Sequence, residues 1–146
     1  MSHATSFVET TINDLADRYV MLWNEPDPER RRLLVAELWT EDGAQILQPP
    51  EEMREIAARP GIGMSATLEA HGHAALEARV TSAYDEWVDR QGIRFGRRDD
   101  VDRVGDVVKF HWEAIDADDQ VTGVGLTFLV VDASGRIRRD YQFIES

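Results

Sequence analysis

The sequence predicts an α+β domain in which N-terminal helices pack on one face of a curved sheet of mixed but mainly antiparallel strands. Up to about residue 90, apolar residues recur at intervals of three and four, which is the period of an amphipathic helix. After Gly92 the period changes to two, and turn-forming residues separate the alternating segments. Helices first and a run of strands afterwards is the order of an α+β fold.

Helices are expected in three segments before Gly92. The first begins at a capping box of Ser6 and Glu9 and ends before Pro26; its buried stripe comprises Val8, Ile12, Leu15, Tyr19, Leu22 and Trp23. The second is capped by Asp27 and ends near residues 41–43; its inner face comprises Leu33, Leu34, Leu38 and Trp39. The third spans residues 73–89; its stripe comprises Leu76, Val80, Ala83, Tyr84, Trp87 and Val88.

A short strand is expected over residues 44–47, because Pro49 and Pro50 follow it and lack the N–H donors that further pairing needs. We interpret residues 51–72 as a lid or an edge insertion. Hairpin turns then separate the expected longer strands, which span residues 93–104, 107–115, 121–131 and 137–144. Without a repeat or a linker in the pattern, we expect residues 1–146 to form a single domain.

Composition restricts the classes of partner. The 146 residues are 42% hydrophobic and include no cysteine, so disulfides and thiolate zinc sites are excluded and a reducing, cytoplasmic location is expected. Sixteen Lys and Arg against twenty-eight Asp and Glu give a net charge of −12, which disfavours nucleic acid and anionic membrane surfaces. The N-terminus lacks a signal-peptide pattern, and no apolar run approaches the ~20 residues of a membrane span.

Four segments carry a resemblance to a known family: residues 18–20 (RYV), 38–44 (LWTEDGA), 72–76 (GHAAL) and 132–137 (DASGRI). With them the chain resembles the nuclear-transport-factor-2-like superfamily, also called the SnoaL-like or cystatin-like α+β cone. The resemblance implies an apolar cavity between the helices and the concave sheet face, and a homodimer formed through the convex face. It does not specify an activity, because this fold hosts isomerases, cyclases, epoxide hydrolases, dehydratases and proteins without chemistry.

Residues of characterised members transfer only in part. Tyr19 matches the ketosteroid isomerase tyrosine that donates to a developing oxyanion. The isomerase's general base falls on Leu47 or Gln48, neither of which accepts a proton usefully, and its second oxyanion donor falls on or near Thr127. The strand that carries the catalytic Arg and Asp of limonene-type epoxide hydrolases has apolar residues in this chain. Both of these activities are therefore disfavoured.

The candidate site follows from strand alternation combined with the resemblance. Within residues 107–115 the apolar face holds Phe110 and Trp112, and the family pattern turns Asp140 and Gln142 inward. In a cavity walled by these rings and Trp23, desolvation would raise the pKa of Asp140 and fit it for proton transfer, with Tyr19 polarising a carbonyl or hydroxyl group. The predicted catalytic residues are Asp140 and Tyr19; the predicted ligand-binding residues are Trp23, Gln48, Phe110, Trp112, Thr127 and Gln142.

Alternatives remain open at this point. Asp140 and Gln142 could face solvent with Tyr141 and Phe143 in the core, and Tyr19 could be an ordinary core residue. Arg97 and Arg98 could clamp a carboxylate ligand or simply protect a sheet edge. His71 and His73 lack a third ligand at a suitable spacing, so we expect no metal and no other cofactor. Gly123 and Gly125 could leave room for a ligand or let the sheet bend.

The function expected from these observations is the binding of a small apolar organic molecule in a cone pocket. Acid–base chemistry of an isomerase, cyclase or dehydratase would follow if Asp140 and Tyr19 flank that molecule. The alternative from another class is a non-catalytic module that uses the same cone for ligand binding or dimerisation.

Overall fold

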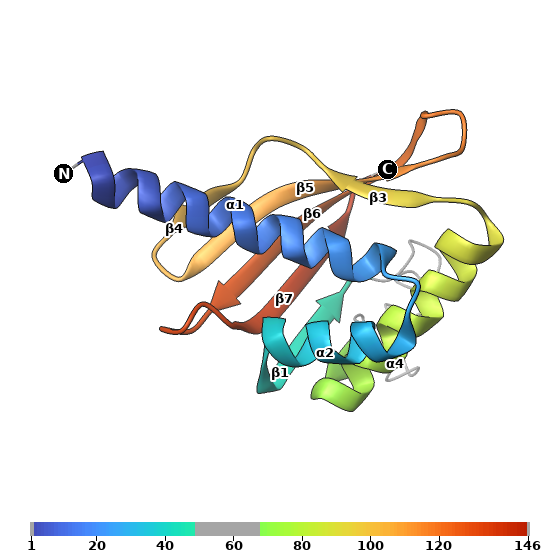
Figure 1. Cartoon of the computed structure of the whole chain (residues 1–146), viewed down its shortest axis with the longest axis horizontal. Helices are drawn as coiled ribbons and strands as arrows, with labels where there is room; N and C mark the ends of the chain where they lie inside the picture. Colours follow the sequence, from blue (N-terminus) through green and yellow to red (C-terminus); the bar gives the residue numbers. More distant parts are fainter. Residues whose placement is uncertain (1, 49–67, 146) are drawn as a thin grey trace, which may run out of the picture.

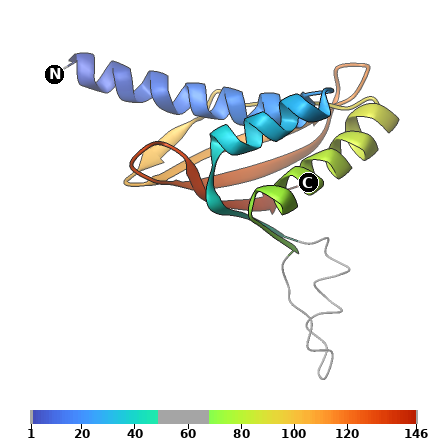
Figure 2. The same ribbon diagram turned by 60° about the horizontal axis from the view of Figure 1, so that its bottom comes forward.

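The computed structural model describes residues 2–48 and 68–145, with the backbone alone for residues 2–10. Its helices lie on one face of the sheet (Figures 1 and 2). They are α1 (Ser2–Asn24), α2 (Pro28–Leu38) and α4 (His73–Ala83), which continues as the π-helical turns η1 (Tyr84–Arg90). None of the described helices is both long enough and apolar enough to span a membrane. We expected a lid or an edge insertion over residues 51–72. Residues 51–67 of this segment lie outside the described residues.

The sheet is mixed and does not close. Its strands are β1 (Trp39–Leu47), β2 (Leu68–His71), β3 (Arg94–Arg97), β4 (Asp102–Val104), β5 (Val107–Ile115), β6 (Val121–Val131) and β7 (Ile137–Ile144). The order in space is β2-β1-β7-β6-β5-β3, with β4 also paired to β5. Strands β5, β6 and β7 form an antiparallel meander, whereas β1 pairs with β7 in parallel. This arrangement confirms the expected fold class, a curved sheet with helices on its inner face.

Several boundaries differ from the sequence prediction. Helix α2 ends at Leu38 because Trp39 turns to an extended conformation and already pairs with Ile137 of β7. The strand expected over residues 93–104 divides into β3 and β4, since Asp100 between them bonds back to the N–H of His111. Strand β2, which pairs with β1, was not predicted. The expected helix over residues 73–89 is present, with a π-helical second half.

The core fills the space between the helices and the inner sheet face. Its fully buried large side chains are Trp39, Phe110, Leu22, Leu38, Leu76, Leu129, Ile137, Val35, Val80 and Val108. Two residues predicted to face this core do not: Leu33 is 51% exposed and Trp87 is 46% exposed. Helical spacing alone put them on the buried stripe, but α2 and η1 pack along one side only, and the wider π-helical turn at η1 changes the spacing there.

Gly125 of β6 provides space for an indole ring and not for a ligand. A Cβ atom at this position would lie 2.1 Å from Cε2 of Trp112, the neighbour of Gly125 on β5. Trp112 therefore packs flat over the backbone of β6. We expect Gly125→Ala to lower the free energy of unfolding by about 1–3 kcal/mol, because the ring must move within a packed interior.

Urea denaturation followed by circular dichroism measures this loss. The matched control is Gly96→Ala on β3, where the new Cβ meets only the end of the Ile115 side chain at 3.2 Å. An equal loss in the free energy of unfolding for the two variants would contradict the role assigned to Gly125.

Candidate functional site

Strand β7 turns Asp140 and Gln142 toward the helices. Asp140 is 0% exposed and Gln142 4% exposed, whereas the intervening Tyr141 and the following Phe143 are 39% and 44% exposed on the opposite face. The predicted inward orientation of Asp140 and Gln142 is confirmed, and the alternative with Tyr141 and Phe143 in the core is wrong. The catalytic and ligand-binding roles of these residues remain predictions.

Tyr19 from α1 meets Asp140 directly. Its hydroxyl donates to Oδ2 of Asp140 across 2.5 Å, and both side chains are buried. Three aromatic rings surround the phenol: the centroids of Trp23, Trp39 and Phe110 lie 6.0, 5.8 and 5.8 Å from that of Tyr19. Tyr19 is thus a core residue by packing, but its hydroxyl bonds a carboxyl group instead of the backbone.

Two glutamines complete a buried polar group around the carboxyl. Gln45 of β1, directly opposite Asp140 in the β1–β7 register, donates through Nε2 to Oδ2 of Asp140 at 3.1 Å. Gln142 donates through Nε2 to Oδ1 of Asp140, and the same amide lies 2.6 Å from Oγ1 of Thr127 and 2.8 Å from the Tyr19 hydroxyl. We refer to Tyr19, Gln45, Thr127, Asp140 and Gln142 as the Asp140 cluster.

The Asp140 cluster is connected to less buried side chains at two ends. At one end, Arg79 of α4 donates to Oε1 of Gln45 at 3.2 Å and to the carbonyl oxygens of Gln45 and Leu68. At the other end, the indole N–H of Trp112 donates to Oε1 of Gln142 at 2.7 Å. Both Arg79 and Trp112 are partly exposed. A chain of hydrogen bonds therefore crosses the interior from α4 to β5 through the Asp140 carboxyl.

Burial dominates the electrostatics of the Asp140 cluster. Desolvation raises the pKa of the Asp140 carboxyl from 3.8 to about 6, against the opposing effect of the hydrogen bonds from Tyr19, Gln142 and Gln45. Desolvation, and next the negative charge of Asp140, raise the pKa of the Tyr19 hydroxyl well above 10. The cluster thus contains a carboxyl that exchanges protons near neutrality and a phenol that keeps its proton.

Of the remaining predicted ligand-binding residues, Phe110 and Trp23 lie beside the Asp140 cluster and Gln48 does not. Phe110 is fully buried against the Tyr19 ring, and Trp23 is partly buried beside it, with its indole nitrogen unpartnered. Gln48 does not join the cluster: its Oε1 accepts from the backbone N–H of Ile144 at 3.1 Å. It lies instead beside a groove of about 380 Å³ on the outer sheet face.

Sequence reasoning missed Gln45 and Arg79. Gln45 lies in the strand that was predicted, but its partner across the sheet depends on the parallel pairing of β1 with β7, for which the sequence carries no local signal. Arg79 belongs to a helix that was predicted, at a position next to the buried Val80. A cation at the border of an apolar helix face is common on solvated helices, so nothing in the pattern singled it out.

Other polar candidates have structural partners. Arg97 pairs with Asp17 at 2.7 Å and Arg98 with Glu113 at 3.2 Å, so both arginines are held in surface ion pairs at the sheet edge. His73 bonds the backbone carbonyl oxygens of Trp39 and Thr40. His111 lies between Asp100 and Glu145, whose carboxylates, Asp100 first, raise its pKa. Among the described residues, no group of three or more acidic or histidine side chains is placed to hold a metal ion.

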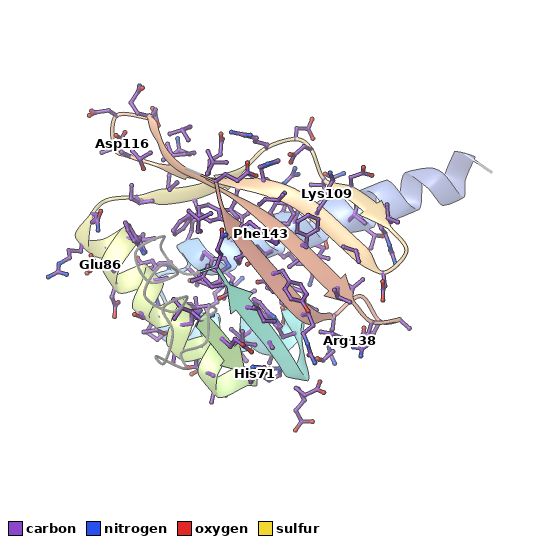
Figure 3. All side chains as sticks on the ribbon, turned by 180° about the vertical axis from the view of Figure 1, so that it is seen from behind. His71, Glu86, Lys109, Asp116, Arg138 and Phe143 are labelled. Atoms are coloured by element: carbon purple, nitrogen blue, oxygen red, sulfur yellow. The ribbon has the colours of Figure 1, made fainter. Side chains whose placement is uncertain are left out.

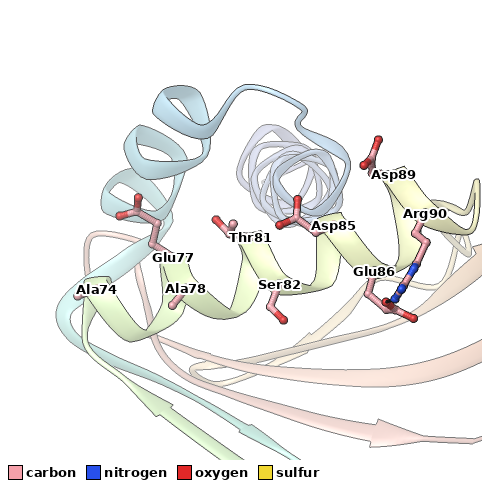
Figure 4. Close-up of a pocket in the computed structure, with 9 residues that line it drawn as sticks. All are labelled: Ala74, Glu77, Ala78, Thr81, Ser82, Asp85, Glu86, Asp89 and Arg90. Carbon is pink, nitrogen blue, oxygen red and sulfur yellow. Dashed lines mark hydrogen bonds and ion pairs between the residues drawn. The ribbon is translucent and has the colours of Figure 1, made fainter.

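A larger groove, of about 940 Å³, runs along the outer side of α4 and η1 (Figure 4). It is lined by Ala74, Glu77, Ala78, Thr81, Ser82, Asp85, Glu86, Asp89 and Arg90. Among the described residues that line it, Arg90 is the only cation, and it is already paired with Glu86. None of its lining residues belongs to the Asp140 cluster, so this groove is not the apolar cone pocket that the sequence predicted.

Comparison with known proteins decides the fold. A SnoaL-like protein from Agrobacterium tumefaciens superposes with a TM-score of 0.74 at 24% identity, covering 94% of this chain and 99% of that one. The chain has the SnoaL-like fold. A SnoaL-like protein of unknown function from Burkholderia thailandensis gives a TM-score of 0.63 at 13% identity, with 94% and 97% coverage.

A third similar structure was solved with a bound small molecule. It is a protein with a ketosteroid isomerase-like fold from Catenulispora acidiphila in complex with trimethylamine, and it gives a TM-score of 0.59 at 10% identity, with 88% and 83% coverage. No protein-family model and no curated protein matches the sequence. These structural similarities support the fold and do not specify a ligand or a reaction.

Proposed function

We propose that this SnoaL-like chain binds a small organic carbonyl compound beside the Asp140 cluster and transfers a proton to or from it, in an isomerase-, cyclase- or dehydratase-like reaction. The observation that carries the proposal is the fully buried carboxyl of Asp140, hydrogen-bonded to the Tyr19 phenol and held at a pKa of about 6. Strongly perturbed titratable groups in a fold that commonly encloses ligands are typical of functional sites.

The energetic cost of this arrangement supports a functional role. Raising the pKa from 3.8 to about 6 lowers the stability of the folded state at neutral pH by about 3 kcal/mol, at about 1.4 kcal/mol for each pKa unit. Neutral or apolar side chains close a core of this size without that loss. A network that served packing alone would gain nothing from the charge.

The proposed reaction begins with the ionised form of Asp140. The carboxylate removes a proton from the carbon next to the carbonyl of the ligand, and the electron pair of the broken C–H bond moves onto the carbonyl oxygen. As the ligand binds, Tyr19 turns its O–H from Asp140 to the carbonyl oxygen, where it stabilises the enolate that forms. Because the Tyr19 hydrogen bond is the strongest of those that lower the pKa of Asp140, this turn makes the carboxylate more basic as the ligand binds.

Access to the Asp140 cluster requires side chains to move. Asp140 and Tyr19 are 0% and 3% exposed, so a ligand must displace part of the aromatic shell around them. Trp23 and Trp112 pack against the core but are only partly buried, and we propose that the ligand enters past them. The Agrobacterium relative is provisionally named an isomerase and the Catenulispora relative holds trimethylamine, which are both compatible with a small ligand inside this fold.

The closed state of the cluster also favours a second candidate function. If no ligand enters, the chain is a non-catalytic module in which the Asp140 cluster fixes the relative positions of α1, β1 and β7. Deuterium exchange separates the two candidates. With acetylacetone, cyclohexenone and β-tetralone as probes in D₂O, proton transfer predicts that the protein accelerates exchange next to the carbonyl of at least one probe. The non-catalytic module predicts the buffer rate for all three.

We also propose that two chains associate through the outer sheet face. On this face Phe143 and Tyr141 are about two-fifths exposed, Phe128 packs edge-on against Phe143 at 5.7 Å, and none of the described helices covers them (Figure 3). Leu126 and Phe128 line the groove of about 380 Å³ next to them. Apolar side chains gathered on one sheet face are typical of an interface.

Phe143→Glu tests the dimer. Light scattering at micromolar concentration is expected to give twice the chain mass for the wild type and the single chain mass for the variant, because the new charge would be buried without a partner. Trp87→Glu, an equally exposed aromatic on η1, is the control and keeps the dimer. A monomeric wild type would contradict the proposed interface.

A further inference from the structure

We infer that Arg79 and Trp112 are positioning residues, which fix the amides of Gln45 and Gln142 as donors to Asp140 and so reserve this carboxyl for the role of proton acceptor. The inference rests on the proposed function and names which of the two acid–base roles Asp140 takes in it. A side-chain amide has a donor end and an acceptor end that its neighbours must match. The chemistry of those neighbours decides the orientation of each glutamine.

The Gln142 amide has one possible orientation. The indole nitrogen of Trp112 carries a hydrogen and no lone pair that can accept, so the atom 2.7 Å from it must be the oxygen of Gln142. The NH₂ group consequently faces Asp140, Thr127 and Tyr19. The ring of Trp112 occupies the space directly above Gly125, where any side chain would displace it.

The Gln45 amide is oriented by the same logic from the other end. The Arg79 guanidinium has only donors, so the atom 3.2 Å from its Nη1 is the oxygen of Gln45. Nε2 of Gln45 then points to Oδ2 of Asp140 at 3.1 Å. Two further bonds from the same Nη1, to the carbonyl oxygens of Gln45 and Leu68, hold the guanidinium in position.

The Asp140 carboxyl therefore receives donors on both oxygens. Tyr19 and Gln45 donate to Oδ2, and Gln142 donates to Oδ1. The two fixed amides offer no acceptor for the hydrogen of a protonated carboxyl, which leaves only the Tyr19 hydroxyl, after it has turned, to accept that hydrogen. The surroundings thus oppose the desolvation that favours the neutral form, and they keep a desolvated carboxylate ready to accept a proton.

The test compares the proton affinity of Asp140 in variants, measured by ¹³C NMR titration of the side-chain carboxyl in the full chain. Trp112→Phe removes the indole donor without changing any charge. We expect it to raise the proton affinity about tenfold, because the freed Gln142 amide can turn its oxygen to a protonated carboxyl. The control is Trp87→Phe, on the exposed side of η1, which leaves the affinity unchanged.

Arg79→Met gives a second, independent measurement on a half-buried residue outside the packed core. It is expected to raise the proton affinity of Asp140 by a similar factor, because the variant loses both the nearby positive charge and the donor that orients the Gln45 amide. Arg79→Lys, which also offers only donors, should restore part of the wild-type value. Arg90→Met is the control for loss of a surface cation.

Unchanged proton affinity in both Trp112→Phe and Arg79→Met would overturn the inference. If Trp112→Phe does not fold, the comparison of Arg79→Met with Arg79→Lys decides, and equal proton affinities of Asp140 in these two variants would also overturn the inference. The titration uses no substrate. Failure of the positioning roles is therefore distinguishable from failure of the proposed function, which the deuterium exchange of the wild-type chain tests separately.

Discussion

Replacing Asp140 with asparagine is expected to slow deuterium exchange next to the carbonyl of a responsive probe by about 10²–10⁴-fold, the contribution usual for a positioned general base. The amide has nearly the shape of the carboxylate but cannot take a proton. The wild-type rate should rise with pH and level off with a midpoint near 6, since the ionised form of Asp140 is the base. NMR of the probe in D₂O measures both the rate and its pH dependence.

Two further variants make this result specific. Asp89→Asn changes an exposed carboxyl on η1 and should leave exchange unaffected. Tyr19→Phe removes the hydroxyl proposed to stabilise the enolate and should slow deuterium exchange by about 10²–10³-fold. Exchange at the wild-type rate in a folded Asp140→Asn protein would show that the base is another group, and the proposed mechanism would have to be abandoned.

The second large effect concerns stability. Between the ordinary pKa of 3.8 and the folded-state pKa of about 6, the native protein binds more protons at Asp140 than the unfolded chain does. Stability from this group is therefore fully present below about pH 4 and is lost as the pH rises through 6. The free energy of unfolding of the wild type should fall by about 3 kcal/mol relative to that of Asp140→Asn over this range.

Urea denaturation of both proteins from pH 4 to pH 8 measures this difference. The two proteins share all other titrating groups, including His111 with its raised pKa, so contributions from those groups cancel when the two curves are subtracted. A difference that stays constant with pH would show that Asp140 has an ordinary proton affinity in the folded state. It would then remove the energetic argument for a functional site.

Local signals in the sequence were sufficient for much of the fold. The bounds expected for β5, β6 and β7 agree with the structure, because alternation and turn residues act between neighbours along the chain. Asp27 caps α2 as expected, with its side chain accepting from Glu29. The family resemblance correctly turned Asp140 inward, a choice that alternation alone left open.

Contacts between segments far apart in the chain could not be predicted from such local signals. Gln45 reaches Asp140 only because β1 lies parallel to β7, and Arg79 reaches Gln45 only because α4 packs beside β1. Gly125 on β6 could not be interpreted without the position of the Trp112 ring, which fills the space above it. Exposure of Leu33 and Trp87 likewise depends on how far neighbouring elements extend.

The most direct test of a poised carboxyl at Asp140 is its own titration in the wild-type chain. ¹³C NMR of the side-chain carboxyl, assigned by its loss in Asp140→Asn, should give a pKa of about 6, and the value should be higher in Tyr19→Phe, which lacks the phenol donor. A wild-type value near 4, the ordinary range for aspartate, would contradict a buried carboxyl poised for proton transfer in the Asp140 cluster.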